Sequence, residues 1–260
     1  MRGEELLYKM ELIDPAYIEA ADAKPRKKRN AWLKWTAAAA CLCVAAGAAF
    51  AMLPRDSQTP TEPAPMEFVL SDETTAKVSY GYEEGTVGRI DYDLVPLTEE
   101  EMFAWEKMYV FRGRVSELTN ITIDYNGDWK HVRCIATIAV DKVYLGDIRA
   151  GDKINMLLPC PIGVDGIWVE ETDVIAHLEC GMEGIFMPFV YDSDSRCEMN
   201  GAVLMYRDIA DCGLGDGERW AFLSKGESLI FAEWAYPGAK NAETLDDVEE
   251  YVVEMLKKVS

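Results

Sequence analysis

The chain has 260 residues, of which 49% are apolar, and its net charge is -20. This apolar content, with 7 Trp, 12 Tyr and 8 Phe, excludes a chain that is disordered throughout. Residues 55–260 hold 18 basic and 40 acidic residues, a net charge of -22, which argues against binding to nucleic acid or to an anionic membrane surface.

Residues 1–30 are predicted to form a basic tail on the cytoplasmic side of a membrane. Residues 1–23 read as two short helices, the second with Asp14 as its N-cap and Pro15 at its first position. A segment this short cannot bury a core of its own. We therefore expect either a loosely ordered tail or a peptide that folds against a cytoplasmic protein partner.

Residues 31–53 are predicted to be a transmembrane helix. The stretch from Thr36 to Leu53 has no charged residue, and as a helix it would span roughly 27 Å, just enough to cross the hydrocarbon core. Six basic residues lie shortly before it and only Arg55 follows closely, so the positive-inside rule keeps the N-terminus in the cytoplasm. Residues 36–53 would then contact membrane lipid, and the C-terminal domain would lie outside the cell membrane.

Two alternatives to an anchor remain open for this segment. Ala49-Phe50-Ala51 fits a signal-peptide cleavage site, and the same stretch is also compatible with a buried helix of a soluble protein. A lipoprotein is not expected, because Ala38 stands three places before Cys41, where a lipoprotein has Leu.

The head of the chain looks like the start of many small bacterial membrane proteins of unassigned role, and some membrane-bound anti-sigma factors share its layout. The zinc module common in those regulators needs His and Cys before the span. Residues 1–35 contain neither, so regulation is only an analogy of architecture.

Residues 54–65 are predicted to be an extended, Pro-rich spacer, and residues 66–260 an acidic, β-rich domain. Thr98 and Glu101 form a capping box that opens a short helix to about Lys107. Alternating apolar residues then predict strands. These strands are Tyr109–Val115, Ile121–Tyr125, His131–Tyr144, Lys153–Leu158, Trp168–Ile175, Ile185–Tyr191, Val203–Tyr206 and Ser228–Trp234.

Two further local signals shape this domain. Asn126-Gly127 is typical of a tight turn that pairs the strand before it with the strand after it. Thr244 is predicted to cap a C-terminal helix with one apolar stripe, which must be buried against another part of the domain. The stripe consists of Leu245, Val248, Val252, Met255, Leu256 and Val259.

Residues 108–191, under half of the chain, resemble the netrin/TIMP-like module. The resemblance rests on Val110–Val115, Ala139–Asp147, Gly151–Ile154 and Cys180-Gly181 with Gly184–Phe189. It implies an OB-like antiparallel barrel of five strands. We expect Val110, Val115, Ile138, Val140, Ile154 and Phe186 to fill it and the C-terminal helix to cover an open side.

The sequence departs from that module at two points. Leu145 stands where the module usually has Lys, and the domain has no Cys at its start, since its first is Cys134. The inhibitory members of the family ligate a protease's zinc through an N-terminal Cys. Protease inhibition is therefore not implied for this chain.

No residue pattern in the sequence predicts a catalytic, cofactor or metal site. His131 and His177 belong to no metal or Cys-His signature. Asp192-Ser193-Asp194 and the stretch from Asp208 to Glu218 offer oxygen ligands for calcium, but neither follows an EF-hand loop, so solvated loops are favoured.

Five cysteines in the outer domain exclude a complete set of internal disulfides, because five is an odd number. Cys160 and Cys180 are the first candidates for a pair, with buried thiols as the favoured alternative. Asn120-Ile121-Thr122 matches a glycosylation acceptor, which we interpret as a chance match.

Two functions remain open after these exclusions. The first, which we favour, is a non-enzymatic binding or sensing module outside the membrane, with an unknown ligand. The second is an enzyme or inhibitor of unrecognised pattern that uses the acidic loops. An exposed apolar patch would favour the first, and a cleft with buried, pKa-shifted carboxylates would favour the second.

Overall fold

The computed structural model describes residues 68–83, 88–91, 93–226 and 228–260. The chain divides into two compact units, Met1–Ala64 and Pro65–Ser260, and the described residues belong to the second. The predicted tail (1–30), transmembrane helix (31–53) and spacer (54–65) lie outside the described residues. Within the described ranges, none of the helices is long and apolar enough to cross a membrane.

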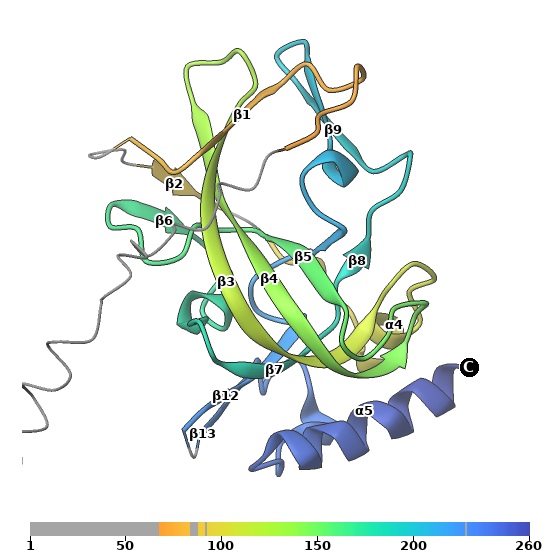
Figure 1. Ribbon diagram of the computed structural model, residues 1–260. Coiled ribbons are helices and arrows are strands. Elements are labelled where there is room, and N and C mark those ends of the chain that lie inside the picture. Colours follow the sequence, from red (N-terminus) through yellow and green to blue (C-terminus); the bar gives the residue numbers. More distant parts are fainter. Residues whose placement is uncertain (1–67, 84–87, 92, 227) are drawn as a thin grey trace, which may run out of the picture. The chain divides into compact units, whose positions relative to one another are not determined.

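Two long strands form the centre of the domain. β3 (Val110–Asp124) and β4 (Lys130–Leu145) pair antiparallel along their whole length, and β5 (Lys153–Leu158) pairs with β4. The β3–β4 register shifts at three places. Such bulges increase the local twist, so the strands wrap around a core instead of lying flat (Figure 1).

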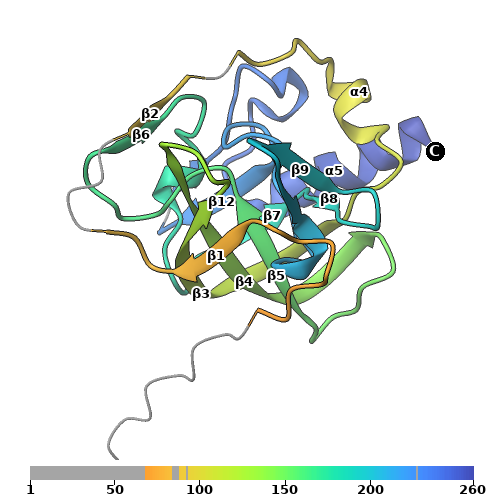
Figure 2. The ribbon, with the colours of Figure 1, turned by 90° about the horizontal axis from the view of Figure 1, so that it is seen from above.

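The sheet curls into half a barrel (Figure 2). Its strand order is β13-β12-β7-β3-β4-β5-β11-β8. In addition, β1 pairs with the C-terminal end of β3, at residues 121–124. Most of its neighbours are antiparallel, and β11 runs parallel to β5. The strands not yet given are β1 (Lys77–Tyr80), β7 (Glu183–Phe186), β8 (Phe189–Val190), β11 (Cys212–Gly213), β12 (Ala221–Lys225) and β13 (Ser228–Ile230).

The last strand of this order returns to the chain just before β3. Tyr109 N donates a hydrogen bond to Pro188 O at 2.9 Å, and Val190 N donates to Lys107 O at 3.0 Å. A single β-bridge joins Met108 to Phe189 between these bonds. The structure therefore confirms the predicted fold class in its general features, namely a mainly β domain with a barrel-like curled sheet and a C-terminal helix.

The inner face of the curl holds the main apolar core. All six side chains predicted to fill it are buried in one cluster, which confirms that part of the prediction. They are Val110, Val115, Ile138, Val140, Ile154 and Phe186.

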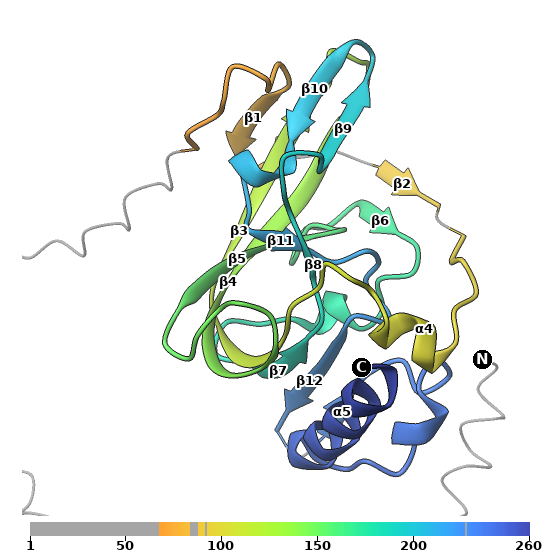
Figure 3. The same ribbon diagram turned by 90° about the vertical axis from the view of Figure 1, so that its right-hand side faces the viewer.

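A second apolar cluster lies on the opposite face of the same strands and was not predicted. Ile135 of β4 belongs to it, although its neighbour Ala136 belongs to the main core. The covering layer is a hairpin of β9 (Arg196–Met199) and β10 (Ala202–Met205), which contributes Leu204 (Figure 3). Because both faces of this half of the sheet are covered, β4 is apolar on both sides there.

The two predicted helix caps are confirmed. Thr98 opens α4 (Glu99–Phe103), which ends earlier than predicted because residues 107–109 are extended and bond to β8. Thr244 opens α5 (Leu245–Val259), with its hydroxyl accepting from Asp247 N at 3.2 Å. The α5 stripe is buried and packs against β7, β12 and α4.

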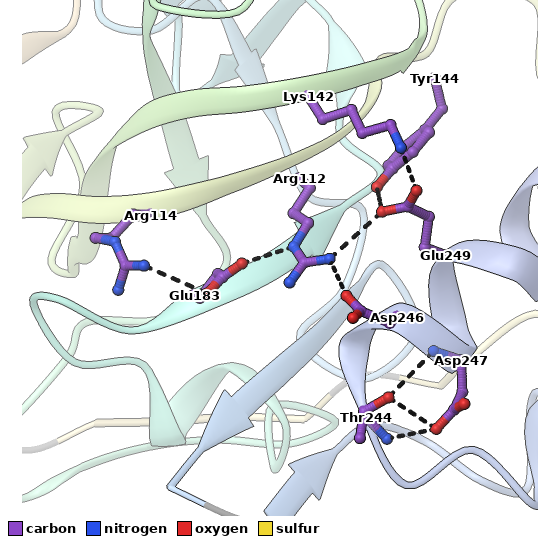
Figure 4. A network of polar contacts seen from close by, with 9 residues as sticks. All are labelled: Arg112, Arg114, Lys142, Tyr144, Glu183, Thr244, Asp246, Asp247 and Glu249. Carbon is purple, nitrogen blue, oxygen red and sulfur yellow. Dashed lines mark hydrogen bonds and ion pairs between the residues drawn. The ribbon is translucent and has the colours of Figure 1, made fainter.

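A network of charged side chains joins α5 to the curled sheet (Figure 4). Arg112 of β3 donates to Glu183 of β7 at 2.6 Å and also contacts Asp246 and Glu249 of α5. Glu249 in turn accepts from Tyr144 of β4 at 2.7 Å. The apolar stripe and this network together fix α5 on the β7 side of the half-barrel.

Several predicted strands differ from the structure. Tyr109–Val115 and Ile121–Tyr125 are parts of one strand, β3, whose bulge between Val115 and Glu117 keeps the pairing continuous. The predicted strand Ile185–Tyr191 is broken at Pro188, which has no N–H to donate, into β7 and β8. Trp168–Ile175 is only a short strand, because Glu171 takes a left-handed φ of 57°.

The turn at Asn126-Gly127 joins β3 to β4 as predicted, but it is longer than a two-residue turn. The last ladder pair is Asp124 with Lys130, which leaves residues 125–129 as the connection. Tyr125 leaves the ladder because its side chain is buried in the second cluster. The short elements around this hairpin and the core are β2 (Gly88–Ile90), β6 (Ile167–Val169), η1 (Ile175–His177), η2 (Tyr206–Asp208) and η3 (Pro237–Ala239).

Candidate functional site

An open groove of about 680 Å³ lies at the tip of the β3–β4 hairpin. Its lining comes from the β3–β4 loop with the start of β4 (126–132), the two-stranded ribbon of β2 and β6, and the turn of the β9–β10 hairpin. These three segments lie far apart in the sequence and come together only in the folded domain, where all three line the groove. A volume of this size is typical of sites for small or medium-sized ligands.

Two asparagines shape the groove where the two hairpins meet. Asn126 and Asn200 both take left-handed φ values, 60° and 50°. Asp124 fixes the first turn by accepting a hydrogen bond from Asn126 N at 2.8 Å. A Cβ at Gly127 would lie 2.5 Å from the Asn200 Nδ2, so a larger residue there would make the Asn200 side chain move where the two turns approach each other.

Two exposed tryptophans stand at the groove and beside it. Trp129 lines it with 66% of its surface exposed, and its ring lies against Gly88. Trp168 of β6 is 51% exposed, and the Arg89 guanidinium lies 4.6 Å from its ring centroid. Met199 is a third exposed apolar side chain in the lining. The domain therefore presents an apolar patch to solvent, which is a common mark of a binding surface.

Most of the formal charges in the groove are already paired. Arg89 forms ion pairs with Asp91 and, at 3.0 Å, with Glu170, while Lys130 pairs with Glu83 at 2.9 Å. These pairs are exposed, so they contribute little to stability, but they reduce the charge available to a ligand. The groove is thus aromatic and polar without strong net charge.

His131 lies at the inner end of the lining. Burial lowers its pKa, and the nearby Arg133 lowers it further, so the imidazole is neutral at pH 7. Its ring packs edge-on against Tyr125 at 5.3 Å. It serves as a wall of the groove, whereas His177 is exposed on η1.

The acidic loops are only partly the solvated loops that we predicted, because Asp194 and Asp211 are exposed whereas other acidic residues of these loops are buried or hydrogen-bonded. Asp216 and Glu218 are buried, and Asp208 accepts hydrogen bonds from Ser71 and Thr74. Asp192 accepts from Ser195 and pairs with Lys107. Among the described residues, no three acidic, His or Cys side chains are grouped so that they could hold a metal ion. These carboxylates instead stabilise loops through hydrogen bonds and ion pairs.

Glu218 is the acidic-loop residue whose pKa is raised, mainly by burial and also by Asp173, Glu171 and Asp216 nearby. Its carboxylate accepts a hydrogen bond from Asp173 N. An ionised carboxylate at this position destabilises the folded state, because the buried charge is less well solvated there than in the unfolded chain.

We therefore expect Glu218→Gln to increase the free energy of unfolding at pH 7. A raised pKa means that the wild-type residue favours folding when it is protonated, so the gain should disappear as the pH falls below the ordinary value of 4.5. Urea unfolding at pH 7 and pH 4 measures this, with the exposed Glu106→Gln as the control. Equal stability of Glu218→Gln and wild type at pH 7 would contradict the assignment.

All five cysteines of the domain are free thiols, so the candidate pair Cys160–Cys180 is wrong. Cys160 is buried beside the main core, whereas Cys180 is exposed in the turn before β7. Burial raises the pKa of Cys134 to about 12 and that of Cys160 to about 11, which keeps both thiols protonated and unreactive. The favoured alternative of buried thiols holds for Cys134, Cys160 and Cys212.

The asparagine of the glycosylation pattern has a structural role. Asn120 Nδ2 donates to Ile162 O at 2.8 Å, and its Oδ1 accepts from Ile162 N at 3.0 Å. Both ends of the amide are used to hold the loop after β5. A glycan on this nitrogen would have to break that contact, in agreement with a chance match.

Comparison with known proteins finds no family model and no curated protein that matches the sequence. The groove must therefore be interpreted from its own residues. Sequence reasoning used Asn126 and Gly127 only as a turn and missed Trp129, Trp168 and Asn200. One signal was available, since Trp129 is a large apolar residue beside a hairpin turn, where polar residues are usual.

Proposed function

We propose that this chain is a membrane-anchored protein whose outer domain binds or senses a ligand through the groove at the β3–β4 tip. The observation that carries the proposal is the exposed aromatic lining around Trp129, on the β3–β4 loop that approaches the turn at Asn200. Exposed aromatic side chains on a rigid frame are typical anchors of binding surfaces. The single span at residues 36–53 and the acidic character of residues 55–260 support a place outside the membrane.

The proposal includes two finer points. The half-barrel would be an OB-like barrel of the netrin/TIMP-like type, supported by the hydrogen bonds that join β8 to residues 107–109, directly before β3. Residues 1–23 would bind a cytoplasmic protein, which is what a sensor needs to pass on its state. Nucleic acid is not expected as a partner, because the outer domain is strongly acidic.

The enzyme or inhibitor alternative gains no support from the acidic loops. Its best cleft contains Asp216, but that carboxylate is paired with Arg219 at 2.8 Å and receives backbone hydrogen bonds. A carboxylate held in this way is poorly placed to move a proton or hold a substrate. We therefore keep binding as the proposed function.

Labelling of Cys180 tests the location. Because this thiol is exposed, a membrane-impermeant maleimide should label it in intact cells as fully as in lysed cells. A tag at Met1 should stay protected from added protease. Cys180→Ser combined with Cys197→Ser, whose thiol is half-buried, should abolish the maleimide signal from intact cells. Labelling that appears only after lysis would contradict the outer location, and a mature protein starting near Met52 would replace the anchor by a cleaved signal peptide.

A second labelling experiment tests the groove. Met199→Cys, in a chain with Cys180→Ser and Cys197→Ser, places a thiol in the lining. It should react more slowly in intact cells, where ligand is present, than in the purified protein. Trp129→Ala should remove that protection. Equal reaction rates in cells and in purified protein would contradict a ligand in the groove.

A further inference from the structure

The groove contains polar groups that no other part of the domain uses. The side chains of Asn126, Asp128 and Asn200 are exposed, and within the described part of the chain they form no hydrogen bond or ion pair. Their neighbours Arg89 and Lys130 are in ion pairs. Two amides and one carboxylate are thus left to face whatever enters the groove.

These groups line the same groove as a flat apolar side chain, Trp129. Trp129 stands beside Asp128 on the hairpin loop, and Asn126 and Asn200 are brought together by the approach of the two turns at Gly127. An indole face is electron-rich and favours C–H groups that carry a small positive charge. An amide both donates and accepts hydrogen bonds, and a carboxylate only accepts.

From this combination we infer that the groove binds a neutral oligosaccharide. The inference rests on the proposed function, since it names the ligand of the same site. A pyranose ring offers one face of C–H groups that can stack on Trp129 and a rim of hydroxyls that can pair with Asn126, Asn200 and Asp128. The volume of about 680 Å³ and the open shape accommodate part of a longer chain.

Other ligand chemistries fit the groove less well. The carboxylate of Asp128 and the charge of -22 on residues 55–260 repel anionic ligands, including anionic polysaccharides. A purely apolar ligand would remove the two amides from water without giving them new hydrogen bonds, which costs free energy. A neutral peptide remains as the competing class for the test to separate.

The test uses the full-length chain in phospholipid nanodiscs, because sugar-based detergents would compete for the site. Calorimetric titration with cellohexaose, chitohexaose, maltohexaose and mannohexaose covers different linkages, and a neutral Gly/Ser-rich hexapeptide is the other probe. We expect at least one saccharide to bind. Trp129→Ala should then weaken its Kd by about 10-fold or more, as for an anchor residue, and Asn200→Ala by about 2- to 10-fold, as for one lost hydrogen bond.

Trp234→Ala is the matched control, because this tryptophan is 62% exposed but lies between β13 and η3, outside the groove lining. It should leave the Kd unchanged. Saccharide binding that survives Trp129→Ala would overturn the inferred site. Binding of the hexapeptide alone, or of no probe while Met199→Cys stays protected in cells, would overturn the ligand class and leave the proposed function intact. If Met199→Cys were not protected from labelling in intact cells, the proposed function itself would be contradicted.

Discussion

Replacing Asp216 with alanine is expected to lower the free energy of unfolding by about 3–5 kcal/mol, because it leaves a buried guanidinium without its carboxylate. Asp216 and Arg219 are both buried, with a closest contact of 2.8 Å. The Asp216 carboxylate also accepts from Trp220 Nε1 at 2.7 Å and from the backbone N–H groups of Glu218 and Arg219. Removing this carboxylate therefore leaves several buried hydrogen-bond donors without an acceptor.

Urea unfolding of the unit Pro65–Ser260, followed by tryptophan fluorescence, measures this loss. A double variant, Asp216→Asn with Arg219→Met, keeps an oxygen for the backbone donors and removes the buried cation. It should be more stable than Asp216→Ala. The control is Glu179→Ala, which breaks an exposed ion pair with Lys225 and should cost no more than about 1 kcal/mol. Similar decreases in the free energy of unfolding for Asp216→Ala and Glu179→Ala would contradict a larger contribution of the buried pair to stability.

Replacing Phe186 with alanine is expected to cost about 3–5 kcal/mol, the usual range for deleting a buried aromatic ring. Phe186 lies on β7 with no exposed surface, and its ring centroid is 5.8 Å from that of Phe111. Its strand pairs with β3 on one side and with β12 on the other. The cavity would open at the centre of the curl, where the backbone on both sides is fixed by hydrogen bonds and cannot collapse to fill it.

The same unfolding measurement separates the cavity from a general effect of substitution. Phe186→Leu keeps most of the volume and should cost less than about 1.5 kcal/mol. Val95→Ala changes a side chain that is already exposed and should stay within about 0.5 kcal/mol of wild type. If Phe186→Ala were no more costly than Phe186→Leu, the curl would not be packed around this ring.

Local features of the domain at residues 66–260 were well predicted from the sequence. Thr98 and Thr244 cap helices because each has an acidic residue three places later that completes a reciprocal pair of hydrogen bonds. The sequence also correctly placed Ile138 and Val140 of β4 in the main core. These signals act within a few residues, so the sequence alone carries them.

The predictions that were wrong concern residues whose structure depends on contacts with distant parts of the chain. Nothing near Pro188 in the sequence shows that β7 and β8 must pair with different partners, and nothing near Cys160 shows that Cys180 faces solvent. The acidic stretch around Asp216 looked like a solvated loop, because its partner Arg219 becomes buried with it only when the domain packs.

The sequence by itself determined the uneven charge, the uncharged stretch at residues 36–53, the mainly β character of residues 66–260 and the caps of the helices there, since each depends on composition or short spacing. Only the tertiary structure decided the groove. Asn126 and Asn200 are 74 positions apart in the sequence, and they meet because the β9–β10 hairpin packs over the outer face of β3 and β4. Local spacing cannot encode that contact, because it depends on the burial of a second apolar cluster by strands distant in the chain.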